Sequence, residues 1–485
     1  MFYQENYSLN HHFQNTICAL SSPPGKGAIA LIRITGADTF SILSKIFNKD
    51  LGEVKGNTIH FGVISDSSSR QSEIIDSSLP LNDKKVIIDE VLVSVFRAPH
   101  TYTGEDLAEI SCHASPFIIR KILSLLMEKG CEAATPGEFT MRAFMNKKMD
   151  LSQAEAVADL ISSQSDASHK LAMQQVRGGF SKEISALREQ LIHFASLLEL
   201  ELDFAEEDVE FADRTEFLKL IDKLILSVKT LADSFEFGNV IKNGIPVAII
   251  GVPNVGKSTL LNSLLNENRA LVSEIAGTTR DTIEDMVTIK GVDFRFIDTA
   301  GLRETKDVVE KMGIERTYDK IKDSSILLYL IDGGNINKNE IQNNITAIQK
   351  RAGENKKLWV IINKSDLIKN IDEVKTDLHD LENVMYLSAK ENFGVEELKN
   401  HLYEFVQNNS FAQQDLVVTN ARHHAALTKA LASLSLVKEG MQNKIPGDLL
   451  AVDIRKTLYH LGEITGEIST DDLLGNIFSK FCIGK

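Results

Sequence analysis

The chain has 485 residues, 43% of them hydrophobic, and a formal net charge of −15 at pH 7, which is enough for about three domains of ~150 residues each. The acidic balance argues against nucleic-acid binding through bulk electrostatics, so a nucleic-acid partner would have to meet a local basic patch or a second subunit. There are four cysteines without a C-x-x-C pair, no secretory signal at the start and no apolar run of the ~20 residues that span a membrane, and these features predict a cytoplasmic protein without disulfides or structural zinc.

The first part of the chain is predicted to be a mixed α/β domain. Residues 28–36, AIALIRITG, and 89–99, DEVLVSVFRAP, are β-rich runs bounded by Gly and Pro. The segment 115–130, SPFIIRKILSLLMEKG, has apolar residues at helical spacing and Gly130 as its expected C-cap. We therefore expect an N-terminal α/β domain over residues 1–147.

The rest of the chain changes pattern twice. Long amphipathic helices are predicted from about residue 151, and helical spacing returns after about residue 410. Between them, strand and helix patterns alternate, which predicts a parallel sheet in a doubly wound fold. The expected fold is thus α/β plus all-α, with a Ras-like domain over residues 243–407 inserted into a helical domain made of residues 148–242 and 408–485.

A phosphate-binding loop follows the first strand of this Ras-like domain. The stretch GVPNVGKST, residues 251–259, fits G-x-x-x-x-G-K-[ST] between a strand and an amphipathic helix. Its backbone N–H groups would wrap the phosphates at a helix N-terminus. We expect Lys257 to reach the β- and γ-phosphates and Ser258 to bind Mg²⁺.

Three further motifs stand at the ends of later strands. DTAG (298–301) offers Asp298 to a Mg²⁺-bound water and Gly301 to the γ-phosphate. NKSD (363–366) supplies the carboxylate of Asp366, which can accept from both N1–H and the N2 amine of guanine, and adenine presents no such pair. SAK (388–390) can add a backbone contact to the base, so the four elements together predict a GTPase domain. The predicted GTP-binding residues are Asn254, Val255, Gly256, Lys257, Ser258, Thr259, Ser273, Glu274, Ile275, Ala276, Gly277, Thr278, Thr279, Asp298, Thr299, Ala300, Gly301, Asn363, Lys364, Asp366, Ser388, Ala389 and Lys390.

Hydrolysis in this domain needs a device other than a glutamine. Leu302 follows DTAG where Ras-like enzymes carry the glutamine that orients water. Asn254 could bind a monovalent cation beside the β- and γ-phosphates, and the loop SEIAGTTRD (273–281) could supply Thr279 to Mg²⁺. The alternative for Asn254 is an amide that only stabilises its own loop.

The motifs GxPNxGKS, AGTTRD and DTAGLRE, with the ending CIGK, resemble those of the MnmE (TrmE) family of bacterial tRNA uridine-modification GTPases. The resemblance extends over nearly the whole chain, through SPPGKGAIALIRITG, YTGED and PGEFTMRAFMNKKMDLSQAEAVADLI. It implies a K⁺ site made by the side chain of Asn254, the carbonyls of Ser273 and Ile275, and Thr278. It also places a catalytic acid on Glu310, which from spacing alone reads as a solvated helix-face carboxylate.

The same resemblance gives the N-terminal domain a tetrahydrofolate-binding fold. The implied folate contacts are Arg33, Glu109, Lys148 and Lys485, and the ligand would be 5-formyl- or 5,10-methylene-tetrahydrofolate. Arg33 alone would read as an outward-facing strand charge. One departure is visible: the family usually follows its histidine here with two glycines, whereas His113 is followed by Ala114-Ser115.

The chain ends FCIGK, residues 481–485. Cys482 has the register of a prenylation box, but Gly484 and Lys485 do not fit one. The resemblance places this tail at the folate, where Cys482 would be a catalytic thiol toward the uridine or a folate-borne carbon. The alternative is a small buried hydrophobe that anchors the tail.

Membership of this family implies a homodimer through the N-terminal domains and a heterotetramer with the flavoprotein MnmG, which supplies FAD. Together they would add a carboxymethylaminomethyl or aminomethyl group at C5 of the wobble uridine, position 34, of certain tRNAs. Two alternatives remain: a switch GTPase such as a ribosome-assembly factor, and a folate aminomethyltransferase that gained a regulatory GTPase. The switch GTPase predicts neither the ending FCIGK nor the folate-like N-terminal domain, and the ending also weighs, less strongly, against the aminomethyltransferase.

Overall fold

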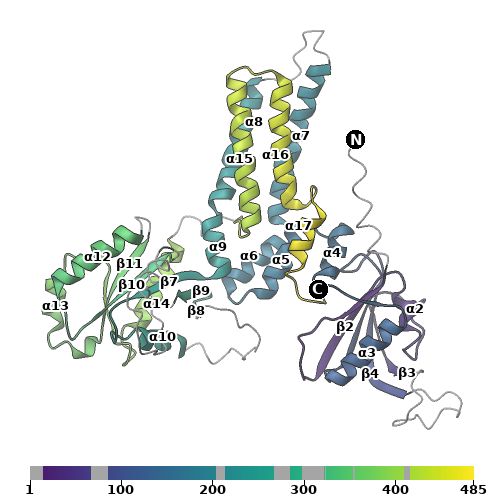
Figure 1. Ribbon diagram of the computed structural model, residues 1–485, viewed down its shortest axis with the longest axis horizontal. Coiled ribbons are helices and arrows are strands. Elements are labelled where there is room, and N and C mark those ends of the chain that lie inside the picture. The colour runs from purple at the N-terminus through teal and green to yellow at the C-terminus, as the bar shows by residue number, and fades with distance from the viewer. Residues whose placement is uncertain are drawn as a thin grey trace, which may run out of the picture. The chain divides into compact units, whose positions relative to one another are not determined.

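A computed structural model gives the fold and describes residues 15–66, 86–203, 214–266, 284–297, 322, 324–352, 356–408 and 416–484. The chain divides into two compact units (Figure 1). The first consists of residues 1–158, 175–189 and 459–485, and the second of residues 159–174 and 190–458. Each unit is described by itself below. No helix in the described part of the chain is both long and apolar enough to cross a bilayer.

The first unit contains a six-stranded mixed sheet of order β3-β4-β5-β2-β1-β6. Its strands alternate between two faces, so that Ala30, Ile32 and Ile34 of β2 are buried while Arg33 points to the opposite face. The buried face packs under helices α2 (Thr39–Leu43) and α3. The strands are β1 (Ile17–Leu20), β2 (Ile29–Thr35), β3 (Thr58–Asp66), β4 (Val86–Phe96), β5 (Leu107–His113) and β6 (Glu132–Ala133).

Helix α3 (Pro116–Glu128) confirms the helix expected over residues 115–130, with one correction at its end. Lys129 is the C-cap, and Gly130 is the next residue, with φ 118. Glycine belongs there because the chain leaves the helix through a positive φ that other residues rarely adopt. Helices α4 (Glu138–Met145), α5 (Leu151–Ser162) and α17 (Asp471–Phe478) complete this unit, with the adjoining ends of α7 (Gly179–Asp203) and α16 (Gly447–Thr465).

The second unit contains the predicted strand–helix alternation, a sheet of order β12-β11-β10-β7-β9-β8. Helices α10 and α14 pack on one face and α12 and α13 on the other, which confirms a doubly wound arrangement (Figure 1). The strands are β7 (Ile245–Ile250), β8 (Glu284–Ile289), β9 (Val292–Ile297), β10 (Ile326–Asp332), β11 (Lys357–Asn363) and β12 (Val384–Tyr386), and the helices are α10 (Lys257–Asn266), α12 (Lys338–Ala352), α13 (Ile371–Asp377) and α14 (Val395–Gln407).

The expectation of an all-parallel sheet was wrong at one edge. β8 runs antiparallel to β9 because only Lys290 and Gly291 connect them. Both residues have positive φ, 48 and 79, the backbone of a tight hairpin turn whose twist matches that of the strands. Two residues are too few for the crossover that a parallel pair needs.

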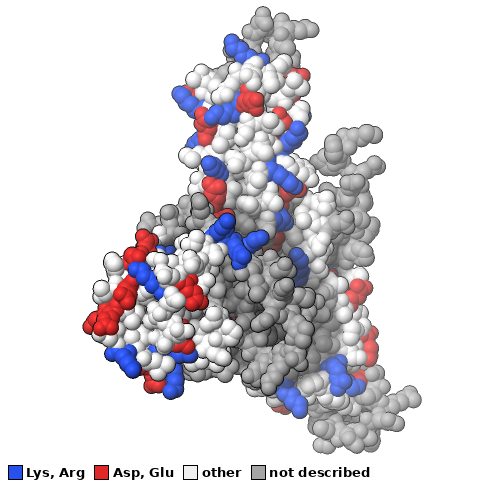
Figure 2. Space-filling view, turned by 60° about the vertical axis from the view of Figure 1, so that its left-hand side comes forward, with Lys and Arg blue, Asp and Glu red and all other residues white. Residues whose placement is uncertain are grey.

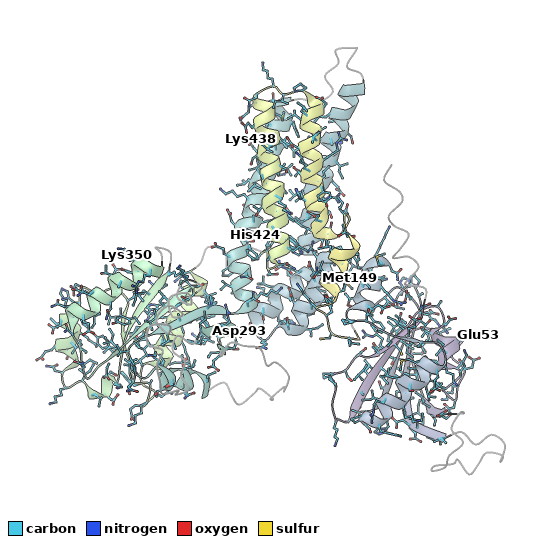
Figure 3. The ribbon with its side chains drawn as sticks, in the orientation of Figure 1. Glu53, Met149, Asp293, Lys350, His424 and Lys438 are labelled. Atoms are coloured by element: carbon cyan, nitrogen blue, oxygen red, sulfur yellow. The ribbon has the colours of Figure 1, made fainter. Side chains whose placement is uncertain are left out.

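This unit also contains helices α6 (Asp166–Val176), α8 (Arg214–Asp233), α9 (Phe235–Asn243) and α15 (Ala421–Gln442), of which α9 packs against β7 and β9. α8 and α15 pack along their length and are joined by an ion pair of 2.6 Å between Lys438 and Asp222. Lys438 and His424 lie toward opposite ends of α15 (Figure 3), and His424 stacks on Phe235 with ring centroids 4.5 Å apart. The chain thus returns to the helices beside the point where it left them.

Candidate functional site

The phosphate-binding loop joins β7 to α10. Asn254 and Gly256 both have positive φ, 63 and 99, which turns the chain back so that α10 begins at Lys257. Gly256 has no substitute here, because a Cβ at this position would collide with the side-chain amide of Asn363. The loop therefore presents its N–H groups at the N-terminus of a helix, where a phosphate binds favourably.

Lys257 is nearly buried in this loop. Its ammonium donates to the carbonyl oxygens of Gly251 and Val252, at 2.6 and 3.1 Å. Ser258 and Thr259 follow it on the first turn of α10 and are exposed. These positions fit the donor set that GTP and Mg²⁺ require, a point charge for the phosphates and a neighbouring hydroxyl for the metal ion.

Asn363 ties the phosphate loop to the predicted base-binding loop. Its amide donates to the carbonyl of Val255 at 2.7 Å, and its oxygen accepts from the N–H of Ala389 at 3.0 Å. Ser388 and Ala389 are buried, whereas the carboxylate of Asp366 is exposed just beyond the end of β11. One buried amide thus joins the loop predicted to bind the phosphates to the loop predicted to bind the base.

Lys364, also in the NKSD motif, is held by Asp332 at the end of β10. Its Nζ lies 2.6 Å from Asp332 Oδ2, and its φ of 58 is left-handed. Burial alone would raise the pKa of Asp332, but hydrogen bonds from Lys364 and from the N–H of Gly334, with the charge of Lys364, bring that pKa below its usual value. Asp332 therefore stays ionised and holds the ammonium group of Lys364 beside the predicted base site.

The remaining predicted nucleotide residues lie outside the described residues. These are Ser273, Glu274, Ile275, Ala276, Gly277, Thr278, Thr279, Asp298, Thr299, Ala300, Gly301 and the predicted acid Glu310. Of the four predicted K⁺ ligands, only Asn254 has a described position, and it is exposed.

In the first unit the structure brings Arg33 and Glu109 together. They face each other across β2 and β5, and Nε and Nη2 of Arg33 both donate to Glu109 Oε1, at 2.9 and 2.8 Å. Arg33 also lies over the rings of Tyr102 and Phe139, 5.5 and 5.7 Å from their centroids. Because both bonds use Oε1, the other carboxylate oxygen has no hydrogen bond among the described residues and can accept from a ligand.

The C-terminal tail lies at this pair. The carbonyl of Gly484 accepts from Ser21 Oγ at 3.0 Å and from Arg33 Nη1 at 3.4 Å. Cys482 is exposed, in contrast to Cys18, Cys112 and Cys131, which are buried. Lys148 donates to the carbonyl of Pro99 at 2.9 Å, and Lys485 lies outside the described residues.

Sequence reasoning missed three residues of this site, Ser21, Tyr102 and Phe139. Tyr102 stands in the YTGED motif, which marked its neighbourhood as part of the family pattern. Ser21 contacts a residue 463 positions away, and no local sequence pattern predicts that contact. At the departure from the family pattern, His113 Nδ1 lies 2.7 Å from Asp89 Oδ1. Ala114 meanwhile exchanges backbone hydrogen bonds with Gly27 and Ala28, so a side chain is accommodated there.

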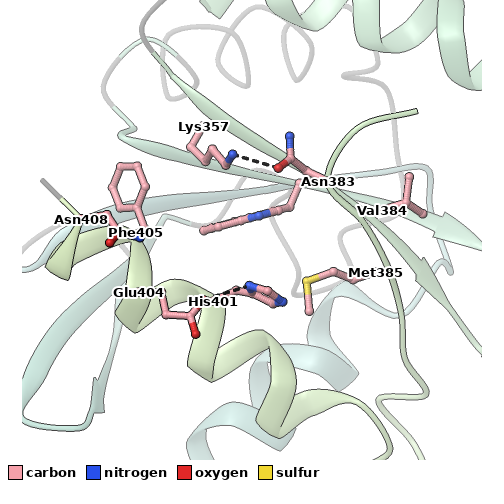
Figure 4. A pocket seen from close by; sticks show the side chains of 9 residues that line it. Lys357, Asn383, Val384, Met385, His401, Glu404, Phe405 and Asn408 are labelled. Atoms are coloured by element: carbon pink, nitrogen blue, oxygen red, sulfur yellow. Dashed lines mark hydrogen bonds and ion pairs between the residues drawn. The ribbon is translucent and has the colours of Figure 1, made fainter. Parts of the chain in front are cut away.

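A pocket of about 470 Å³ opens at the opposite end of the second unit's sheet from the nucleotide motifs (Figure 4). Lys357 and Asn383 form one part of its rim, at 2.8 Å, and His401 and Glu404 another, at 3.4 Å. None of the predicted site residues lines it. The pocket is lined by Lys357, Trp359, Asn383, Val384, Met385, His401, Glu404, Phe405 and Asn408.

Comparison with known proteins identifies the family of this chain. The family model described as the MnmE helical domain matches residues 151–482, and the model described as the N-terminus of the GTP-binding protein TrmE matches residues 16–148. The chain belongs to the MnmE family. The match confirms the family that the sequence motifs predicted.

Relatives in the MnmE family resemble this chain from end to end. The tRNA modification GTPase MnmE of Christiangramia forsetii is 54% identical over 97% of this chain and 99% of its own. Those of Flavobacterium johnsoniae and Bacteroides thetaiotaomicron are 53% and 48% identical, each over 97% of this chain and 99% and 100% of their own lengths.

Proposed function

We propose that this member of the MnmE family hydrolyses GTP while it adds, with the flavoprotein MnmG, a carboxymethylaminomethyl or aminomethyl group at C5 of wobble uridine 34 of certain tRNAs. Its relatives are tRNA modification GTPases over their full length, and this chain is a GTP hydrolase of tRNA modification. The observation that carries the proposal is that one chain holds both a phosphate-loop GTPase site and the Arg33–Glu109 pair with the tail against it.

The nucleotide site supports GTP hydrolysis by position and charge. Lys257 and the loop N–H groups would hold the phosphates, Ser258 and Thr279 Mg²⁺, and Asp366 the guanine. K⁺ would bind Asn254, the carbonyls of Ser273 and Ile275, and Thr278, and neutralise charge that develops between the phosphates. Glu310 would orient water. A leucine follows DTAG, so the charge of K⁺ and the carboxylate of Glu310 replace the missing glutamine.

The N-terminal site supports a folate ligand by its donors and acceptors. The second oxygen of Glu109 would accept from the pterin amine, and Arg33, Lys148 and Lys485 would bind the anionic end of 5-formyl- or 5,10-methylene-tetrahydrofolate. The folate would supply the one-carbon unit, and FAD held by the partner would supply the redox chemistry. Cys482, exposed on the docked tail, would act as nucleophile or acid at this site.

The proposed assembly is a cytoplasmic homodimer through the N-terminal domains, joined by MnmG into a heterotetramer that binds tRNA. The GTPase domain would be inserted in the helical domain. The N–H of Val418, on the returning chain, donates to Ser234 Oγ at 3.0 Å, which supports this arrangement. On the face drawn in Figure 2, the described Lys and Arg are interspersed with Asp and Glu, so the partner would contribute much of the tRNA-binding surface.

A surface suited to the dimer is the open face, by which we mean the face of the N-terminal sheet that carries Ile29, Ile59, Phe61 and Leu92. Their side chains are 72, 67, 56 and 45% exposed, because α2 and α3 cover the other face. Phe61 and Leu92 pair directly across β3 and β4, and an exposed apolar patch of this kind marks a protein interface.

Mass spectrometry of wobble uridines tests the proposal, in cells that lack the gene and carry either the wild type, Asp366→Ala or Cys482→Ser. The wild type should restore a C5-modified uridine, and Asp366→Ala should not. If Cys482→Ser also fails, the tail thiol is required. If it succeeds, the tRNA function stands and Cys482 is structural. If the wild type changes no uridine but binds a ribosomal subunit, the switch-GTPase alternative replaces the proposal.

A further inference from the structure

The C-terminal tail is fastened within the first unit at two points, one against helices α4 and α5 and one at the N-terminal sheet, with Cys482 between them. At the first point, Phe478 and Phe481 are buried with ring centroids 5.4 Å apart, in a cluster with Leu151, Ala154 and Leu474. At the second, Gly484 is buried beside β1, where its carbonyl accepts from Ser21 and Arg33. Cys482 and Ile483 between them are exposed, so the thiol has a fixed position while it faces solvent.

Gly484 fits its place because it has no side chain. Its φ of 93 is a conformation that L side chains rarely adopt. A Cβ would in addition collide with the carbonyl oxygen of Leu20 and lie 2.9 Å from the Cα of Ser21. Both obstacles are backbone atoms, which cannot rotate away. The glycine of the tail motif is therefore a docking residue.

Gly137 completes the first fastening point in the same way. Its N–H donates to the carbonyl of Cys482 at 3.4 Å, and its φ is 71. A Cβ on Gly137 would lie 2.7 Å from the carbonyl oxygen of Phe478 and 3.1 Å from the Cβ of Phe481. Two glycines, one on each side of the contact, thus allow the tail and the N-terminal domain to approach closely.

Arg33 connects the tail to the ligand face. Its guanidinium is planar and rigid. Nε and Nη2 donate to Glu109, and Nη1 donates to the carbonyl of Gly484. Tyr102 and Phe139 lie along it and limit its movement. A shift of Glu109 toward a ligand therefore changes the group that holds the tail carbonyl.

We propose that Ser21, Arg33 and Gly484 are positioning residues that hold the Cys482 segment as one wall of the N-terminal binding site, so that tail docking and folate binding stabilise each other. The identity of the ligand rests on the proposed function, whereas the docking itself does not. Because coupling between two binding events is reciprocal, a ligand that stabilises the docked tail must lose the same factor in affinity when the tail is released.

Native thiol labelling reports the docking. Cys18, Cys112 and Cys131 are buried, whereas Cys482 is exposed. Burial, and to a smaller extent the nearby charge of Asp89, raises the pKa of Cys112 to about 11. Ellman's reagent at pH 8 therefore reacts with Cys482 and reports its accessibility. The variants are Gly484→Ala and Ser21→Ala, and the matched control is Gly475→Ala, where a Cβ meets nothing within 4 Å. Cys482→Ser gives the background, and circular dichroism checks that every variant is folded.

We expect Gly484→Ala to label about tenfold faster than the wild type without ligand, because the bulky reagent then meets a released tail, and Gly475→Ala to be unchanged. Ser21→Ala should change the rate in the same direction by a smaller factor. Equal rates for Gly484→Ala and Gly475→Ala would overturn the docking role.

Titration calorimetry with 5-formyltetrahydrofolate tests the coupling in the same proteins. The ligand should slow labelling of the wild type, and Gly484→Ala should bind it about tenfold more weakly while Gly475→Ala binds it normally. Unchanged affinity in a folded Gly484→Ala variant would overturn the coupling. If the wild type binds no folate, the folate part of the proposed function fails, while the rates without ligand still decide the docking.

Discussion

At the predicted nucleotide site, a single side chain can hold two loops together by hydrogen bonding to their backbone groups. Asn363 is buried, and both ends of its amide bond to the backbone of other loops, Val255 and Ala389. Asn363→Ala should leave both groups buried and unpaired, at a cost of about 1–3 kcal/mol each, and weaken GTP binding by tenfold or more. Fluorescent-nucleotide titration and thermal unfolding measure the two effects. The control is Asn343→Ala, an exposed asparagine on α12, which should change neither.

A substitution at Asn254 can distinguish a K⁺ ligand from an amide that only stabilises its own loop. Its φ of 63 means that alanine would disturb the backbone as well as remove the amide, whereas glycine removes only the amide. If Asn254 binds K⁺, Asn254→Gly should abolish the stimulation of GTP hydrolysis by KCl over NaCl and keep nucleotide affinity within about threefold. Retained stimulation by K⁺ would mean that the amide only stabilises its loop.

At the scale of helices and strands, the sequence predicted some elements of the GTPase sheet and missed others. The motifs stand at strand ends as expected, because the buried strands β7, β10 and β11 read as continuous apolar runs. β8 was missed although Val287 and Ile289 alternate with exposed positions, since Lys-Gly is not a common hairpin turn. The tail contacts were beyond sequence reasoning for another reason. Ser21 and Gly484 meet only once the whole first unit has folded.

The β8–β9 hairpin also connects the GTPase sheet to α6. The carbonyl of Gly291, at its turn, accepts from the N–H of Ala167 at 3.0 Å in the first turn of that helix. Since β9 ends where DTAG begins, the contact fixes the element that leads into a predicted phosphate-contacting motif. Gly291→Ala places a Cβ 3.1 Å from the Cβ of Asp166 at a φ of 79.

We expect Gly291→Ala to destabilise this contact by about 1–2 kcal/mol and to change the rate of GTP hydrolysis more than the affinity for GDP. Hydrogen exchange of the Ala167 amide, with steady-state kinetics, measures this. Gly475→Ala is the control, because its φ is not positive and its Cβ would meet nothing within 4 Å. Unchanged exchange at Ala167 would mean that the hairpin contact contributes nothing.

At the scale of the molecule, one extended surface bears on assembly. The open face of the N-terminal sheet carries exposed apolar side chains, and Phe61 lies on it beside Leu92 of the neighbouring strand. A lysine at position 61 would bury an unpaired charge in any interface formed there. Phe61→Lys should therefore shift the protein from dimer to monomer in analytical ultracentrifugation, whereas Phe117→Lys, at an exposed site on α3 of the covered face, should not. A dimer that survives Phe61→Lys would place the interface elsewhere.

Helix α9 of the second unit packs into the core of the GTPase sheet, and this packing bears on whether the two unfold together. Ile241 of α9 is 5% exposed and belongs to the core under the GTPase sheet, with Phe237 and Val240 packed against it. The helix that leads into the GTPase domain is thus part of that domain's core. Ile241→Ala should cost about 2–5 kcal/mol, whereas Ile192→Ala, at 45% exposure on α7, should cost much less.

Scanning calorimetry with and without GDP identifies the transition that Ile241→Ala affects. GDP binds only the folded nucleotide site, so it raises the temperature of whichever transition unfolds that site. If α9 and the sheet unfold together, Ile241→Ala lowers that same GDP-sensitive transition, because the cavity lies in the core that the nucleotide stabilises. A loss confined to a GDP-insensitive transition would mean that α9 unfolds with the other helices, and that movement of the GTPase sheet does not reach the helices through its packing on α9.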